Sequence, residues 1–175
     1  MFIKGSDIAL RAMEPNDASI LYEWENNTDL WPVSNSQIPF SHFVLEEFVN
    51  ASHQDIYTNK QLRLMVTSLA DQKTIGVIDL YEFDPQHARA GIGIYIQEGY
   101  RGKGYAKQSI ELIKDYAFNF LHLKQIYTHV NESNVASLTL FDASGFEKSG
   151  LLKHWHKTGL NTYDNVWFLQ CYNAN

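Results

Sequence analysis

The sequence has little cysteine and no long hydrophobic run. Cys171 is the one cysteine among 175 residues, which excludes a disulfide within the chain and a zinc site built from several cysteines. No stretch approaches the ~18 consecutive apolar residues of a membrane span. Residues 1–10 include Lys4 and Asp7 and lack the apolar segment of a secretory signal peptide. We therefore expect a cytoplasmic protein without a membrane partner, in which Cys171 is a small buried residue.

Basic residues are outnumbered as well. The chain has 14 Lys and Arg against 20 Asp and Glu, a formal net charge of −6, whereas nucleic-acid-binding domains usually carry a basic excess. This composition disfavours a nucleic-acid partner. Hydrophobic residues make up 45% and aromatic residues 14%, enough for a folded core. The length is typical of one domain, and we expect a single domain over residues 1–175.

The hydrophobic periodicities predict an α/β domain. Near the N-terminus a strand over residues 8–13 precedes two helices, one opened by residues 15–17 and one beginning at Ser41, with a proline-containing loop over 31–40 between them. The expected buried positions of the second helix are Phe43, Val44, Phe48 and Val49.

The middle of the chain alternates with a period of two. Strands expected over residues 62–66, 75–82 and 88–96 are joined by short turns, which predicts an antiparallel meander. A helix then follows over 104–121, with Phe120 on its apolar side. The remaining expected elements are a strand over 126–130, a short helix over 137–144, and strands over 146–152 and 163–172 with a loop between them.

The segment from Arg101 to Ala106, with sequence RGKGYA, lies between an expected strand and the longest expected helix. Its glycines let the backbone approach a ligand closely, and the free N–H groups and positive dipole of the helix N-terminus favour an anion. Arg101 and Lys103 add positive charge to an acidic chain. The segment therefore predicts an anion site, most naturally for a pyrophosphate, with a tight strand-to-helix turn as the plainer alternative. Its spacing is neither GxxxxGK[ST] nor GxGxxG.

These residues resemble a known signature. Arg101, Gly104 and Ala106 match the acetyl-CoA motif Gln/Arg-x-x-Gly-x-Gly/Ala of the GCN5-related N-acetyltransferases, the GNAT family. The segments 75–76, 89–94 and 163–166 look like the branch of ribosomal-protein and spermidine acetyltransferases. A second family motif, Asn-x-x-Ala/Ser-x-x-Leu-Tyr-x-x-x-Gly-Phe, is matched at Asn134, Ser137, Leu140, Gly145 and Phe146.

The resemblance implies the GNAT fold, a mixed and mostly antiparallel sheet, splayed between two middle strands and flanked by helices, with acetyl-CoA in the splay. Backbone N–H groups of residues 102–106 would hold the pyrophosphate, and the strand at 94–96 would pair with the pantetheine arm. Asn134 would contact that arm or cap the short helix. The cofactor-binding residues so implied are Ile94, Tyr95, Ile96, Arg101, Gly102, Lys103, Gly104, Tyr105, Ala106, Asn134, Ser137 and Phe141.

The chemistry that the resemblance implies is direct transfer of acetyl from acetyl-CoA to a primary amine in a ternary complex, without a metal. Phe141 occupies the position of the family's usual acid, a tyrosine, and it has no proton to give. Tyr95, or Tyr105, is the candidate replacement. Glu82 is the candidate base, acting through water.

Other bases remain open. Asp79 is expected on the strand face of Tyr81, and Glu82 on the opposite face with Ile78 and Leu80. His129 is a further alternative. Two more histidines, His154 and His156, are expected in a loop near the substrate opening, and their spacing alone does not make a metal site.

The acceptor amine is either a polyamine-like small amine or a protein N-terminus. Carboxylates in the N-terminal helices suit a cation, although an exposed acidic face is the plainer explanation. A catalytically weak acyl-CoA-binding or sensor protein on the same fold is the alternative function, an unrelated phosphate-binding module is a third, and a homodimer is an open alternative for the assembly. The carboxylates concerned are Glu23, Glu25, Asp29, Glu46 and Glu47.

Overall fold

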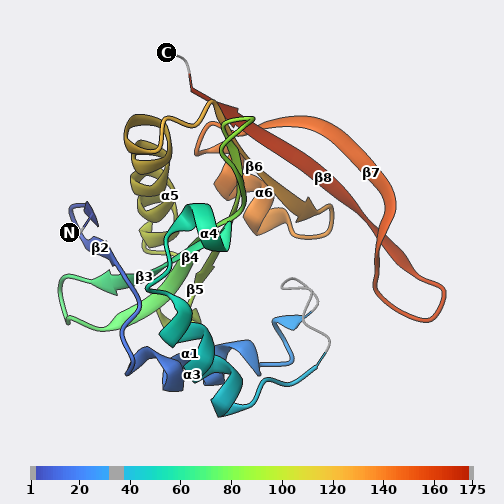
Figure 1. Ribbon diagram of the computed structural model, residues 1–175. Helices are drawn as coiled ribbons and strands as arrows, with labels where there is room; N and C mark the ends of the chain where they lie inside the picture. The colour runs from blue at the N-terminus through green and yellow to red at the C-terminus, as the bar shows by residue number, and fades with distance from the viewer. Residues whose placement is uncertain (1–2, 32–37, 174–175) are drawn as a thin grey trace. The chain divides into compact units, whose positions relative to one another are not determined.

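The computed structural model describes residues 3–31 and 38–173, and they fall into two compact units (Figure 1). One unit comprises residues 13–55, and the other comprises residues 1–12 and 56–175. The single domain over residues 1–175 stays a prediction. Residues 32–37 of the expected loop lie outside the described residues.

The unit of residues 13–55 contains the two expected helices, α1 (Asp17–Glu25) and α3 (His42–Ala51), which contact each other. The side chain of Ser41 caps α3 by accepting a hydrogen bond from the N–H of Val44. The predicted buried side of α3 is wrong in part. Phe43 and Val44 are 68% and 46% exposed, because Leu45 and Val49, one turn apart, form the buried side of the helix.

The other unit is built on one eight-stranded sheet in the order β1-β2-β3-β4-β5-β6-β8-β7. All neighbouring strands are antiparallel except β5 and β6, which are parallel. This confirms the mixed, mostly antiparallel sheet and the expected meander. The strands are β1 (Ile3–Lys4), β2 (Ile8–Arg11), β3 (Leu62–Ser68), β4 (Thr74–Asp84), β5 (Arg89–Ile96), β6 (Gln125–Asn131), β7 (Glu147–Lys157) and β8 (Tyr163–Tyr172).

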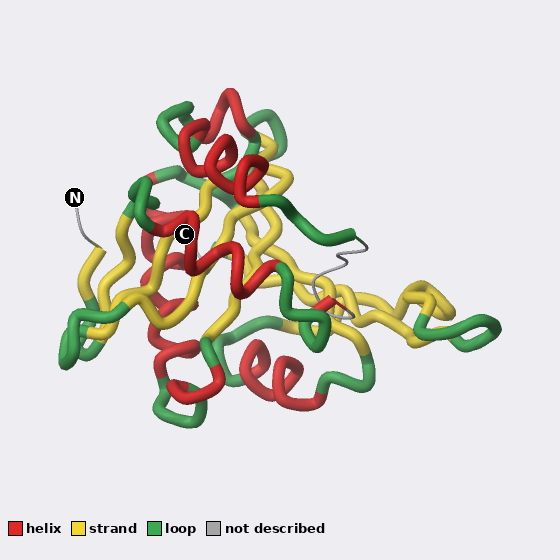
Figure 2. The backbone as a smooth tube through the Cα atoms, turned by 90° about the horizontal axis from the view of Figure 1, so that it is seen from below, coloured by secondary structure: helices red, strands yellow, loops and turns green. Residues whose placement is uncertain are grey.

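Four helical segments belong to the same unit, and α5 runs along the sheet (Figure 2). They are α4 (Ile56–Asn59), a 3-10 turn (Glu98–Tyr100), α5 (Tyr105–Asp115) with a π-helical continuation (Tyr116–Phe120), and α6 (Val135–Asp142). Helix α5 carries the chain from β5 back to the start of β6, the crossover that two parallel strands require.

The core lies between α5 and one face of the sheet. Ile110 and Ile113 of α5 are fully buried with strand residues such as Ile78 and Ile92. Phe120, expected on the apolar side of this helix, is 67% exposed. The π turn explains this error, because it adds a residue to the helical turn and rotates later side chains away from the core.

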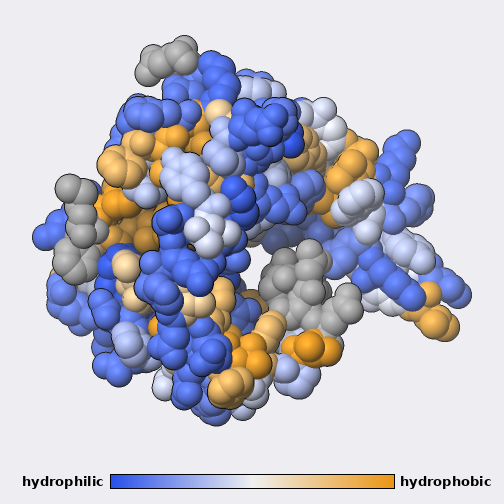
Figure 3. Space-filling model, in the orientation of Figure 1, coloured by the Kyte–Doolittle hydropathy of each residue, from blue (hydrophilic) through white to orange (hydrophobic). Residues whose placement is uncertain are grey.

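The last two strands form a long hairpin, seen at the right of Figure 1. Its turn carries Leu160, a hydrophobic residue that is 86% exposed. Most of the face shown in Figure 3 is hydrophilic. Near its other end Cys171 is buried, as expected, and burial raises the pKa of its thiol. Among the described residues, no helix combines the length and the apolar character that crossing a bilayer would require.

Candidate active site

The sheet divides between β5 and β6. The two strands pair only at their first residues, and the last pair joins Gly91 to Tyr127. Beyond that pair β5 continues to Ile96 and β6 to Asn131, without further pairing between them. The expected splay is therefore present in the part of the chain that the structure describes.

The free edge of β5 can be located from its pairing with β4. The N–H of Gln97 donates to the carbonyl of Ile75, so Gln97 turns its backbone groups towards β4. Residues of an antiparallel strand alternate in this respect. Ile94 and Ile96 therefore turn their N–H and C=O groups towards the gap beside β6. Such an edge matches the amides of an extended ligand.

The segment between β5 and α5 has the conformation that its glycines predict. Gly102 and Gly104 have φ values of 75° and 81°, in the left-handed region that favours glycine. Gly104 is the N-cap of α5, and the first hydrogen bond of the helix runs from Gln108 N–H to its carbonyl. The N–H groups of residues 105–107 precede that bond, so they have no partner within the helix. Free N–H groups at a helix N-terminus suit an anion, so this is the geometry that the predicted anion site requires.

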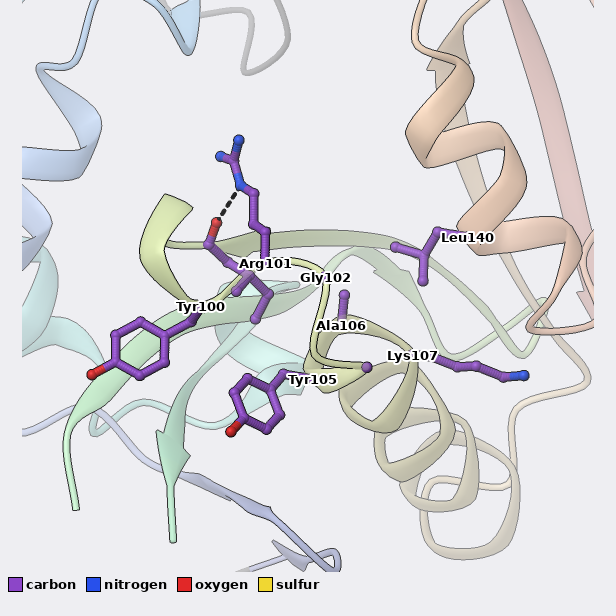
Figure 4. A pocket seen from close by; sticks show the side chains of 9 residues that line it. Tyr100, Arg101, Gly102, Tyr105, Ala106, Lys107 and Leu140 are labelled. Carbon is purple, nitrogen blue, oxygen red and sulfur yellow. Dashed lines mark hydrogen bonds between the residues drawn. The ribbon is translucent and has the colours of Figure 1, made fainter. Parts of the chain in front are cut away.

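A pocket of about 270 Å³ lies at this helix end (Figure 4). Arg101 does not reach across it; its Nε donates to the carbonyl of Ile96 at 2.8 Å, and its guanidinium lies 5.8 Å from the ring centre of Tyr95. Leu140 comes from α6, and the other lining residues come from β5, from the segment between β5 and α5, and from the first turn of α5. The lining comprises Ile96, Tyr100, Arg101, Gly102, Gly104, Tyr105, Ala106, Lys107 and Leu140.

The structure brings most of the expected cofactor residues to this pocket and to the adjoining gap. Lys103 lies beside the pocket, with Nζ 5.2 Å from the ring centre of Tyr100. Asn134 caps α6, where its side chain accepts a hydrogen bond from the N–H of Ser137 at 3.1 Å. Phe141 is only 3% exposed and packs edge-on against Phe146 at 5.0 Å. The position of the family's tyrosine is thus filled by a core residue.

The two tyrosines predicted to act as the acid in place of Phe141 differ in their surroundings. Tyr95 is half-buried on β5, and burial raises the pKa of its hydroxyl. Tyr105 lines the pocket at the start of α5. Both hydroxyls are chemically able to donate a proton.

The predicted face of Glu82 is wrong. A β-bulge between Tyr81 and Asp84 and a φ of 49° turn Glu82 away from the buried side of β4. Its carboxylate accepts a 2.6 Å hydrogen bond from the hydroxyl of Tyr127 on β6.

The other base candidates are placed differently. Asp79 is held by Arg63, with two contacts of 2.8 Å and both side chains largely buried. His129 lies on β6 with its ring centre 5.1 Å from that of Phe168, and burial lowers its pKa. A lowered pKa keeps its ring neutral near pH 7, as a base requires.

His154 and His156 are not in a loop, contrary to expectation. Both lie on β7, which continues to Lys157. His156 Nδ1 lies 2.9 Å from the side-chain nitrogen of Asn131, and His154 packs edge-on against Tyr163. Among residues 3–31 and 38–173 no three His, Cys, Asp or Glu side chains are gathered as metal ligands.

Sequence reasoning overlooked an aromatic group beside Glu82. The ring of Tyr81 lies over Gly91, where any Cβ would overlap it, and meets the ring of Tyr127 edge-on at 6.3 Å. Phe168 of β8 packs on the ring of Tyr127, with 5.4 Å between the ring centres. The alternating pair Gly91 and Gly93 was the available signal, because two glycines on one strand face leave room for side chains from the neighbouring strands.

Comparison with known proteins agrees with this geometry. The family described as acetyltransferase (GNAT) domain matches residues 7–147. Spermidine N(1)-acetyltransferase of Vibrio cholerae is 32% identical over 148 residues, 84% of this chain and 83% of that protein. The Escherichia coli spermidine N(1)-acetyltransferase is 28% identical over 147 residues, 84% and 76% of the two chains. The crystal structure of the Vibrio cholerae spermidine N-acetyltransferase with CoA and spermine has a TM-score of 0.86 at 28% identity, covering 96% of each chain.

The chain therefore belongs to the GNAT family of acetyltransferases, as its two motifs indicated. Its activity is acetyl-CoA-dependent N-acetyl transfer, and its fold is the GNAT fold.

Proposed function

We propose that the chain acetylates a primary amine of a polyamine-like acceptor, by direct attack of the amine on acetyl-CoA in a ternary complex. The observation that carries this proposal is the splay between β5 and β6, which ends at the anion-binding start of α5. The edge of β5 in this splay offers backbone amides that can pair with an amide-rich arm. The N-terminus of α5 that follows it offers N–H groups for a pyrophosphate.

The residues present fit the cofactor. The N–H groups of residues 102–106 would hold the pyrophosphate, Lys103 and Lys107 would add positive charge, and the edge from Ile94 to Ile96 would pair with the pantetheine arm. Asn134 and Ser137 would border the arm from α6. The cofactor supplies an activated thioester when bound.

The chain's own groups supply the remaining tasks. Backbone N–H groups on β5 would stabilise negative charge on the acetyl oxygen. Glu82 would accept the proton of the amine, and Tyr95 would protonate the leaving sulfur. Because a thiol has a pKa of about 8.5, its thiolate leaves readily near neutral pH, so an acid in place of the missing tyrosine hydroxyl accelerates the reaction without being indispensable.

A cationic acceptor is supported by two observations. Residues 13–55 contain eight Asp and Glu and neither Lys nor Arg, so the whole negative charge excess of the chain resides there. Two relatives are named spermidine N(1)-acetyltransferases, and one neighbouring structure contains spermine. Of the two acceptors open from the sequence, these observations favour a polyamine over a protein N-terminus.

The test is release of free thiol from acetyl-CoA with spermidine, spermine, butylamine and a short peptide with a free N-terminus. We expect both polyamines to react with a higher kcat/KM than butylamine, and added salt to reduce that advantage, because salt screens exposed charges. Thiol release with the peptide alone would contradict the polyamine proposal. Tight binding of acetyl-CoA without thiol release on any amine would favour a sensor, the role that Phe141 keeps open.

A further inference from the structure

Glu82 stands at the most irregular point of β4. The pairing of β4 with β5 shifts between Tyr81 and Asp84, and Glu82 has a φ of 49°. A non-glycine residue rarely adopts this left-handed conformation, which persists only where its surroundings hold it. The bulge separates Glu82 from the fully buried Ile78 and Leu80 and leaves it exposed.

At the bulge, the carboxylate of Glu82 accepts the hydrogen bond from Tyr127. The phenol Oη lies 2.6 Å from Oε2 of Glu82, a short distance typical of a donor to a charged acceptor. Tyr127 pairs with Gly91 at the last point where β5 and β6 are joined. The bond therefore links β4 to β6 across β5, over about 10 Å of sheet. It lies at the point where the sheet divides.

Tyr127 is itself held firmly. It is 9% exposed, and its ring packs against Tyr81 and Phe168. Burial and the neighbouring Glu82 raise the pKa of the Tyr127 hydroxyl far above its ordinary value. The hydroxyl therefore keeps its proton and remains a hydrogen-bond donor at every pH used for enzyme assays.

The neighbouring ionisable groups leave Glu82 as the available carboxylate. On β4, Asp79 is already ion-paired with Arg63. On β5, Arg89 contacts Asp84 at 3.3 Å. Tyr81 on β4 and His129 on β6 also face Glu82, and burial favours the neutral form of each. A neutral donor such as Tyr127 orients a carboxylate without cancelling its negative charge.

We propose that Tyr127 is a positioning residue for acetyl transfer, holding the Glu82 carboxylate at the division of the sheet, where it accepts the acceptor's proton through water. The inference rests on the proposed function. In the step concerned, the amine nitrogen bonds to the acetyl carbon, the carbon–sulfur bond breaks with its electron pair passing to sulfur, and the nitrogen's proton passes to Glu82.

Tyr127→Phe removes the hydroxyl and keeps the ring packing. We expect kcat/KM for the acceptor to fall about tenfold, with the KM for acetyl-CoA unchanged.

Two further variants separate positioning from a structural role. Tyr172→Phe is the matched control, because it removes an exposed hydroxyl that bonds Gln170 outside the site, and it should leave activity unchanged. Glu82→Gln provides a second background. If Tyr127 acts through Glu82, adding Tyr127→Phe to Glu82→Gln should cost little further activity.

The outcomes are distinct. An equal loss from Tyr127→Phe in both backgrounds, or a raised KM for acetyl-CoA in Tyr127→Phe, overturns the positioning role. Wild-type enzyme that releases no thiol with any amine overturns the proposed function instead.

Discussion

Replacing Gly104 tests the anion site that we propose at the start of α5. A Cβ at this position would meet no heavy atom within 4 Å, so Gly104→Ala causes no collision and acts only through the backbone. The φ of 81° costs an L residue about 1–2 kcal/mol. If the turn relaxes to avoid that cost, the N–H groups lose their alignment. At about 1.4 kcal/mol per tenfold change, CoA binding should weaken by about five- to thirtyfold.

The assay is calorimetric titration with CoA, combined with thermal unfolding. Gly99→Ala is the control, since its surroundings are equally open and its φ is not left-handed. Gly104→Asn should fall between wild type and Gly104→Ala, because asparagine tolerates the left-handed region better. If Gly104→Ala matches wild type in both CoA affinity and unfolding temperature, the conformational argument is refuted. The same holds if Gly99→Ala is as damaging.

Two other predictions concern buried rings. Phe141→Tyr restores a hydroxyl at the position of the family's tyrosine and should raise kcat, by up to about 10²-fold for a well-placed acid; steady-state rates on folded protein check this, and an unchanged or lower kcat contradicts it. Burial raises the pKa of Tyr81 to about 12, so the unfolded chain releases this proton near pH 10 and the folded chain does not. The free energy of unfolding, measured by urea denaturation, should fall between pH 10 and 12, and it should fall less in Tyr81→Phe. If it falls equally with pH in the two proteins, Tyr81 is not the origin of the effect.

Local chemistry made much of this protein predictable from sequence. The glycines and basic residues around α5, the Ser41 cap and the period-two strands each produce structure through their near neighbours. The glycine turn and the N-terminus of α5 therefore appear where their residues predict them. The family motifs added the splay, which periodicity alone does not reveal.

Several of the errors arise from irregularities in a strand or a helix. A bulge turns Glu82 to the other face of β4, and β7 continues past a register shift between Leu152 and His156, so the two histidines lie on a strand. The π turn rotates Phe120 out of the core. One added residue reverses every later face in a strand, and its position depends on partners distant in sequence. The Glu82–Tyr127 contact, spanning 45 residues, was for this reason not predictable from the chain alone.

The divided sheet has a consequence for the protein without its cofactor. Unpaired strand edges attract other strands and are a common origin of aggregation, which proteins usually counter at the outer rims of their sheets. Here such edges lie in the interior of the sheet, where β5 and β6 part. A ligand that pairs with them acts as a temporary strand and stabilises the folded state by mass action. Binding of such a ligand would thus complete the sheet.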